Sequence, residues 1–172
     1  PVSVYAATKR AGELLSEAYA KLYGLPLAGL RFFTVYGPWG RPDMAYWLFT
    51  EALLKGEPIR LFNQGQMRRD FTDVRDIIDG VMLLVEGLRA PGHQVYNIGH
   101  SEPVSLHRFL SAIESATEIR AQIELAPMQK GDVGDTFADV SKLTRDFGYA
   151  PKIAVEEGVA DFVRWFREYR GV

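Results

Sequence analysis

The stretch from Leu27 to Asp43, LAGLRFFTVYGPWGRPD, decides the fold class. Its first part, Leu27 to Val35, is almost continuously apolar and too short for an ordinary helix, so it predicts a buried strand. The second part, Tyr36 to Asp43, contains two glycines and two prolines, which predicts a loop with fixed turns.

Helical patterns lie on both sides of this stretch. Upstream, apolar residues at helical spacing predict an amphipathic helix from Ser3 to Tyr23, with Ser3 as its N-cap and Gly24 at its end. Downstream, a helix is predicted from Met44 to Lys55. The remaining elements are strands at 59–62, 94–98 and 122–125, a turn at 63–66, helices at 74–88, 105–117, 141–147 and 155–169, and a polar loop at 130–136. This alternation indicates an α/β fold.

The strand from Leu27 to Val35 also indicates that part of a sheet is missing. A strand that is hydrophobic on both faces usually has neighbours on both sides. The other predicted strands are short. We therefore expect further strands of this sheet to lie before Pro1.

The composition excludes several classes of protein. The chain has 172 residues, of which 47% are apolar and 24% are charged, as in ordinary globular domains. A formal net charge of −2 gives no reason to expect nucleic acid, and no apolar run or signal segment indicates a membrane partner. Without cysteines there are no disulfides or thiolate metal sites, which fits a cytoplasmic location. The three histidines share no metal-binding spacing, so no metal site is expected.

Tyr5 and Lys9 form the first candidate for chemistry. Residues four apart on a helix share a face. A phenol is a poor base at neutral pH, but a nearby ammonium favours its ionised form. Such a pair can act as a general acid/base in hydride chemistry on a sugar alcohol. The bare spacing also occurs by chance, with the tyrosine at the edge of a core and the lysine in solvent, so other motifs have to decide.

Three motifs together favour the catalytic interpretation of Tyr5 and Lys9. YAATK at 5–9, GLRFFTVYGPWGRPDMA at 29–45 and RRDFTDVRDI at 68–77 resemble the extended short-chain dehydrogenase/reductases of the NAD-dependent epimerase/dehydratase family. Nucleotide-sugar 4-epimerases fit best, UDP-glucuronate 4-epimerases above all. The resemblance implies the C-terminal portion of a Rossmann-type fold. Residues 1–40 would end the dinucleotide-binding domain, and 41–172 would mainly form the small α/β nucleotide-sugar-binding domain, with segments around 70–100 returning to the Rossmann sheet.

The resemblance also implies roles for single residues. Tyr5 would accept the proton of the sugar 4-hydroxyl, and Lys9 would bind the nicotinamide ribose and favour the ionised tyrosine. Both side chains, together with Phe32, would contact NAD. The substrate-binding residues would be Thr34, Arg41 and Arg69 at the sugar and diphosphate, Arg60 and Phe62 at the uracil, and Gln129 and Asp132 at the uridine ribose. Planar guanidinium groups suit a diphosphate.

Structural interpretations of these residues stay open. Arg41 could cap a loop, Arg69 could pair with a neighbouring aspartate, Thr34 could be an ordinary strand residue and Phe62 could belong to the core.

The implied activity is NAD-dependent epimerisation at C4 of a UDP-sugar, namely UDP-glucuronate and UDP-galacturonate, through a 4-keto intermediate. A dehydratase or decarboxylase of the same superfamily stays open, as does a non-catalytic nucleotide-sugar-binding module. The sequence contains no G-x-x-G-x-x-G, the loop that holds the dinucleotide pyrophosphate in this family. We therefore expect these residues to be part of a longer enzyme, inactive alone and with an incomplete NAD site. The resemblance further implies that the longer enzyme is a homodimer.

Overall fold

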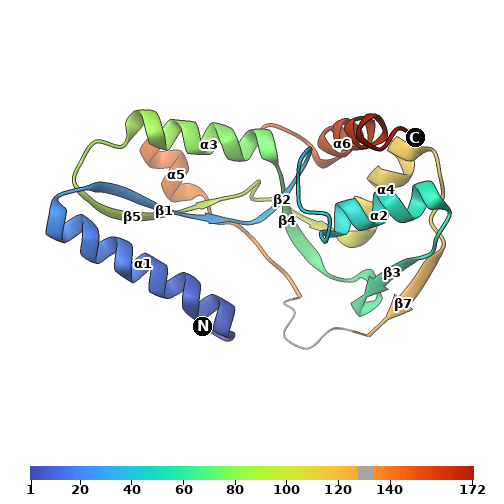
Figure 1. Ribbon diagram of the computed structural model, residues 1–172, viewed down its shortest axis with the longest axis horizontal. Helices are drawn as coiled ribbons and strands as arrows, with labels where there is room; N and C mark the ends of the chain where they lie inside the picture. The colour runs from blue at the N-terminus through green and yellow to red at the C-terminus, as the bar shows by residue number, and fades with distance from the viewer. Residues whose placement is uncertain (128–133) are drawn as a thin grey trace.

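The computed structural model describes residues 1–127 and 134–172. Its elements form two groups along the long axis of the molecule (Figure 1). One group contains α1 (Val4–Tyr23), β1 (Pro26–Phe32), α3 (Val74–Gly87), β5 (Gly92–Ile98) and α5 (Ser141–Phe147). The other contains α2 (Ala45–Lys55), β3 (Ile59–Phe62), the short 3₁₀ helix η1 (Asn63–Gly65), α4 (Leu106–Thr117), β7 (Ile123–Ala126) and α6 (Val155–Arg170). Between them lie β2 (Thr34–Tyr36), β4 (Arg68–Asp73) and β6 (Pro103–Ser105).

Within the described residues, the strands pair in three small sheets. β1 runs parallel to β5, from Pro26 opposite Gly92 to Phe32 opposite Ile98. β4 is the central strand of the second sheet, parallel to β2 and antiparallel to β6. β3 and β7 form a parallel pair. The mixture of mainly parallel strands and helices confirms the predicted α/β class.

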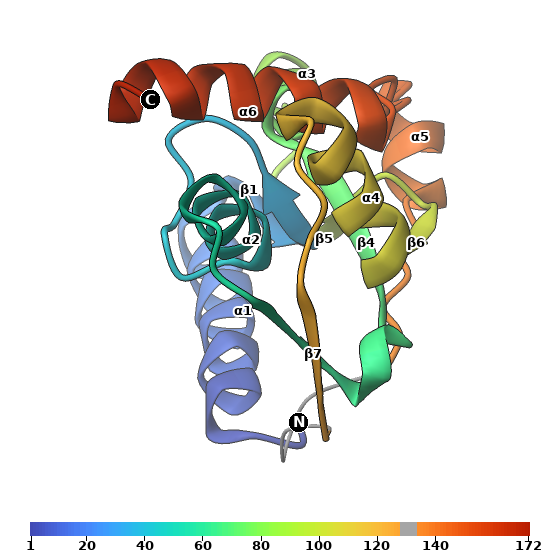
Figure 2. The same ribbon diagram turned by 90° about the vertical axis from the view of Figure 1, so that its right-hand side faces the viewer.

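Each group has its own buried core. In the first group, α1 lies on one side of β1 and β5, and α3 and α5 lie on the other (Figure 1). The buried side chains there are Ile77, Leu84, Tyr96, Ile98, Leu143 and Tyr149. The second core joins α2, α4 and α6 to β3, β4 and β6, and Figure 2 shows α6 crossing above α2 and α4. Phe71 and Phe109 stack at its centre, with ring centroids 3.9 Å apart.

The predicted ends of the first helix are confirmed. The Ser3 side chain accepts a hydrogen bond from the Ala6 amide at 3.1 Å, as an N-cap does. Gly24 ends the helix with φ of 65°, a left-handed conformation that glycine adopts without steric cost. The predicted apolar face of this helix is largely unburied, since only Ala20 is buried in α1.

The prediction of one strand from Leu27 to Val35 is wrong. The run divides at Phe33, whose amide donates to the Ile98 carbonyl at 3.1 Å. Before this point the chain pairs with β5, and after it with β4. The run is also not buried on both faces, because Phe32 is 52% exposed. An apolar run indicates that a segment prefers burial, but it does not indicate which strand the segment pairs with. A change of partner strand within the run therefore cannot be seen in the sequence.

Two strands were not predicted, β4 and β6. β4 has the sequence RRDFTD, which lacks an apolar alternation, yet its last four residues are buried. Asp70 makes this possible: its carboxylate accepts hydrogen bonds from the amides of His100, Ser101 and Ala138. A buried carboxylate that is satisfied by backbone amides costs far less than an unpaired one.

Candidate active site

A cavity of about 1000 Å³ opens between α2, β3 and β4. It contains four of the side chains that sequence analysis assigned to the substrate, namely Thr34, Arg60, Phe62 and Arg69. Its apolar lining includes Phe49, Ile59, Met67, Phe71 and Leu106. An apolar cavity with a few converging polar groups is the usual form of a small-molecule site, and this volume suits a large ligand.

Strand geometry explains why these four side chains meet. Arg60 and Phe62 are two residues apart on β3, and Arg69 and Phe71 are two apart on β4, so each pair shares a face of its strand. Thr34 is the register partner of Phe71 in the β2–β4 pair. All of these residues line the cavity.

The cavity carries charges of both signs. Arg60 lies 3.9 Å from Glu124, its register partner on β7. Lys55 pairs with Glu51 on α2 at 3.0 Å. The Arg69 guanidinium donates to the Gly134 carbonyl at 3.0 Å. Most carboxylates of the wall therefore have a basic partner, which lowers the electrostatic cost of bringing an anion into the cavity.

The aspartates next to Arg69 have other main partners. Asp70 binds the three backbone amides described above and the Thr72 hydroxyl. Asp73 is the N-cap of α3 and forms two side-chain hydrogen bonds with the Arg75 guanidinium, at 2.9 and 3.1 Å. This ion pair is the first cause that holds the Arg75 pKa above its ordinary value.

Arg41 lies at the rim rather than in the cavity lining. Its guanidinium donates two hydrogen bonds to Asp43, at 3.0 and 2.5 Å, and Asp43 lines the cavity. This pairing is the main reason that the Arg41 pKa is raised and the Asp43 pKa is lowered.

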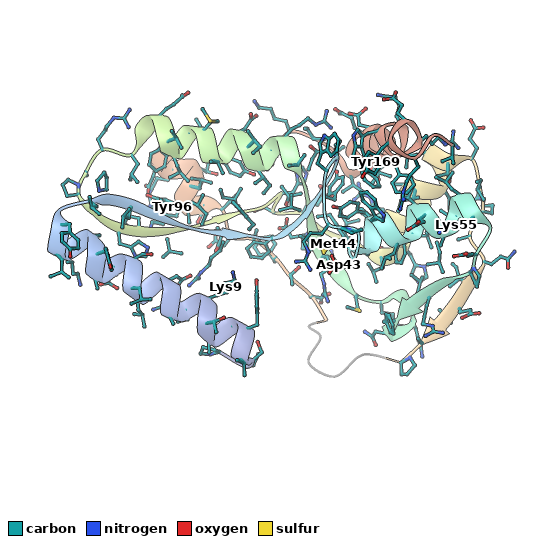
Figure 3. The ribbon with its side chains drawn as sticks, in the orientation of Figure 1. Lys9, Asp43, Met44, Lys55, Tyr96 and Tyr169 are labelled. Atoms are coloured by element: carbon teal, nitrogen blue, oxygen red, sulfur yellow. The ribbon has the colours of Figure 1, made fainter. Side chains whose placement is uncertain are left out.

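Tyr5 and Lys9 share a face of α1, as predicted. The Lys9 ammonium lies 5.3 Å from the centre of the Tyr5 ring, which is a cation–π distance. Figure 3 shows Lys9 on the side of α1 that faces β1, with Asp43 and Met44 across from it at the start of α2. Tyr5 is 71% exposed, and neither residue lines the cavity. Phe32 also lies outside it.

Gln129 and Asp132 fall outside the residues that the structure describes. Their assignment to the uridine ribose therefore stays a prediction, as do the roles of the other site residues.

Sequence reasoning missed several side chains of the cavity, among them Asp43, Lys55, Met67 and Glu124. Asp43 stands in the GRPD sequence beside Arg41, and this alternation of charge was an available signal. No sequence signal pointed to Glu124, because its place opposite Arg60 depends on the pairing of strands that are far apart in the sequence.

Comparisons with known proteins identify the family of the chain. Residues 1–99 match the model of the NAD dependent epimerase/dehydratase family. The chain belongs to this family. It is 41% identical to UDP-glucuronate 4-epimerase 4 of Arabidopsis thaliana, in an alignment that covers 98% of the chain and 42% of that protein.

Two solved structures of family members are similar to the whole chain. UDP-glucuronic acid 4-epimerase of Bacillus cereus, in complex with UDP-glucuronic acid and NAD, has a TM-score of 0.92 and 32% identity, covering 98% of this chain and 54% of that one. A double mutant of the dTDP-glucose 4,6-dehydratase DesIV of Streptomyces venezuelae has a TM-score of 0.89 and 30% identity, covering 99% and 53%. The chain thus has the fold of extended epimerases and dehydratases and spans about half the length of such relatives.

Proposed function

We propose that this chain supplies the catalytic helix and the nucleotide-sugar site of an NAD-dependent epimerase that acts at C4 of UDP-glucuronate and UDP-galacturonate. The observation that carries the proposal is the cavity of about 1000 Å³ lined by Thr34, Arg60, Phe62 and Arg69. The similarity to UDP-glucuronate 4-epimerases supports the choice of sugar.

In this proposal the UDP group occupies the cavity. Arg60 and Phe62 hold the uracil from β3, and Arg69 and the rim residue Arg41 bind the diphosphate, for which a guanidinium fork is suited. Thr34 lies where the sugar joins the diphosphate. The uridine ribose is assigned to Gln129 and Asp132. The sugar then extends past the Arg41 rim toward the first turns of α1.

Tyr5 and Lys9 carry the chemistry at the sugar. The Tyr5 side chain, ionised to the phenolate, accepts the proton of the 4-hydroxyl as the 4-keto sugar forms, and the resulting phenol returns it when the sugar is reduced on the other face. The Lys9 ammonium, 5.3 Å from the Tyr5 ring, stabilises negative charge on the phenol. When bound, NAD would accept the hydride from C4 and return it.

Part of an NAD site fits the residues present. Tyr5, Lys9 and Phe32 are all exposed, so their side chains are accessible to a nicotinamide and its ribose. The sequence has no glycine-rich loop for the pyrophosphate. The proposal therefore assigns pyrophosphate binding to a segment outside these 172 residues.

Exposed apolar side chains on α1 bear on the assembly of the longer enzyme. Leu14, Leu15, Tyr19 and Leu22 of α1 are each more than half exposed, which supports the predicted homodimer of the longer enzyme through this helix. Within the described residues, none of the helices is long and apolar enough to cross a membrane.

Two other functions have specific support. A dehydratase is favoured by the likeness to the dTDP-glucose 4,6-dehydratase. A binding module without catalysis is favoured by the missing glycine-rich loop. Both use the same cavity, and they differ in the product that is formed.

Product analysis with the longest natural protein that contains these residues tests the proposal. Incubated with UDP-glucuronate and NAD, it should yield UDP-galacturonate, identified by proton NMR of the sugar. A 4-keto-6-deoxy product from a nucleotide hexose would identify a dehydratase, and a UDP-pentose with carbon dioxide would identify a decarboxylase. Binding of UDP-glucuronate without turnover would leave only the binding module.

A further inference from the structure

The lysine of the Tyr5–Lys9 pair has a second possible partner on its own helix. Glu13 lies four residues after Lys9, a spacing at which lysine and glutamate attract each other on a helix. Two other pairs with this spacing form ion pairs here, Glu17–Lys21 at 2.6 Å and Glu51–Lys55 at 3.0 Å. Within the part of the chain that the structure describes, Lys9 and Glu13 form none, and the Lys9 ammonium lies over the Tyr5 ring instead.

The reason lies in the partners of Glu13. The Arg31 guanidinium of β1 donates to both carboxylate oxygens, from Nε to Oε1 at 2.6 Å and from an Nη to Oε2 at 2.8 Å. Arg10 adds a bond to Oε2 at 2.5 Å. Arg31 is therefore the only partner of Oε1 among the bonds that the described residues make.

We propose that Arg31 is a positioning residue: by holding both oxygens of Glu13, it keeps Lys9 directed at Tyr5. The inference rests on the proposed function, in which Tyr5 and Lys9 act at the sugar. It gives β1 a role beyond the sheet, because this strand then sets the side-chain arrangement of the catalytic helix.

Lys9 can be attracted to Glu13 only if the Glu13 carboxylate is ionised. The ordinary pKa of 4.5 already leaves the Glu13 carboxylate ionised at neutral pH, with or without Arg31, whose hydrogen bonding is the first cause that lowers this pKa further to about 2. Without Arg31, Oε1 would be an open acceptor four residues from Lys9, while Arg10 could still hold Oε2. The lysine would then divide its time between the carboxylate and the Tyr5 ring.

The test measures the position of Lys9 in the 172-residue chain and needs no turnover. The Lys9 ammonium lies over the Tyr5 ring, 5.3 Å from its centre, so we expect the ring to shift the NMR resonances of the protons on the adjoining Cε upfield. The Lys9→Arg variant assigns these resonances, and Tyr5→Leu gives their position without the ring. The variants compared are Arg31→Gln, Glu13→Gln and the double variant, all of which lose the Arg31–Glu13 ion pair.

The three variants distinguish two effects of losing the ion pair: attraction of Lys9 to the Glu13 carboxylate, and weaker attachment of α1 to β1. Under the proposal only Arg31→Gln reduces the upfield shift, by about twofold, since a helical lysine–glutamate pair is weak. Glu13→Gln and the double variant keep it, because they have no carboxylate to attract Lys9. Equal loss in all three would show that the ion pair only docks α1, and no loss in any would show that Arg31 has no influence on Lys9. Either result overturns the inference.

Two measurements control the test. The Lys21 resonances report the Glu17–Lys21 pair on the same helix and should stay unchanged in every variant, and circular dichroism checks that each variant is folded. Failure of the inference leaves the proposed function intact, since that is tested by its product. In the longer enzyme, the kcat lost in Arg31→Gln should return in the double variant.

Discussion

The Arg60 guanidinium of β3 lies 3.9 Å from the Glu124 carboxylate of β7, and both side chains line the same cavity. Both are more than half exposed, so their attraction contributes little to stability. Their charges should nevertheless act in opposite directions on an anionic ligand. We expect Glu124→Gln to tighten UDP binding by about two- to fivefold, equivalent to ~0.5–1 kcal/mol, and Arg60→Ala to weaken it.

Isothermal calorimetry of the 172-residue chain with UDP checks this prediction. Glu168→Gln on α6, which removes the same charge outside the cavity lining, is the matched control and should have no effect. If Glu124→Gln also left the UDP affinity unchanged, the cavity would not be the site of the anion.

Tyr5 and Arg69 should give different kinetic signatures in the longer enzyme. Tyr5→Phe removes the group that takes the hydroxyl proton, so kcat should fall by about 10²–10⁴-fold with little change in KM. Arg69→Ala removes a contact to the bound diphosphate, so KM for the UDP-sugar should rise more than kcat falls. Steady-state kinetics on both variants measures the contrast, and a Tyr5→Phe enzyme with nearly normal kcat would remove Tyr5 from the mechanism.

The sequence predicted local structure better than it predicted spatial contacts. The cap at Ser3, the end at Gly24 and the helix at Ala45–Lys55 follow from short-range patterns and are confirmed. The sequence did not predict β4, because its burial depends on Asp70. The backbone amides that bind Asp70 belong to residues some thirty and seventy positions away. No periodicity within RRDFTD contains that information.

The same distinction holds for the candidate site. Thr34, Arg60, Phe62 and Arg69 were proposed from a family resemblance, and the strand pairing brings them to one cavity. Glu124 could not be predicted as a cavity residue. It lies in the cavity because β7 pairs with β3, and a single sequence does not reveal which strands pair.

Glu13 predicts a specific dependence on pH. Its folded pKa of about 2 lies below the ordinary 4.5, so its stabilising ion pair is fully present above pH 4.5 and is lost as the pH falls toward 2. The difference in melting temperature between the natural chain and Glu13→Gln should therefore be constant from pH 7 to 5 and shrink below 4.5. An NMR titration of the Glu13 carboxyl carbon gives the direct check, and a midpoint near 4.5 would contradict the ion pair.

Gly158 of α6 provides the last prediction, which concerns stability. A Cβ at this position would lie 2.5 Å from a carboxylate oxygen of Asp73 and closer still to the buried Tyr36 hydroxyl, so α6 can pack here only without a side chain. Gly158→Ala should destabilise the chain by about 1–3 kcal/mol through overpacking, measured as a lower urea midpoint. Gly12 on α1 has no neighbour within 4 Å of an added Cβ, so Gly12→Ala should stabilise the chain by about 0.5–1 kcal/mol. Tyr36→Phe removes one of the two obstructing oxygens, so Gly158→Ala should cost less in that background. An equal cost in both backgrounds would show that the Tyr36 hydroxyl does not restrict this contact.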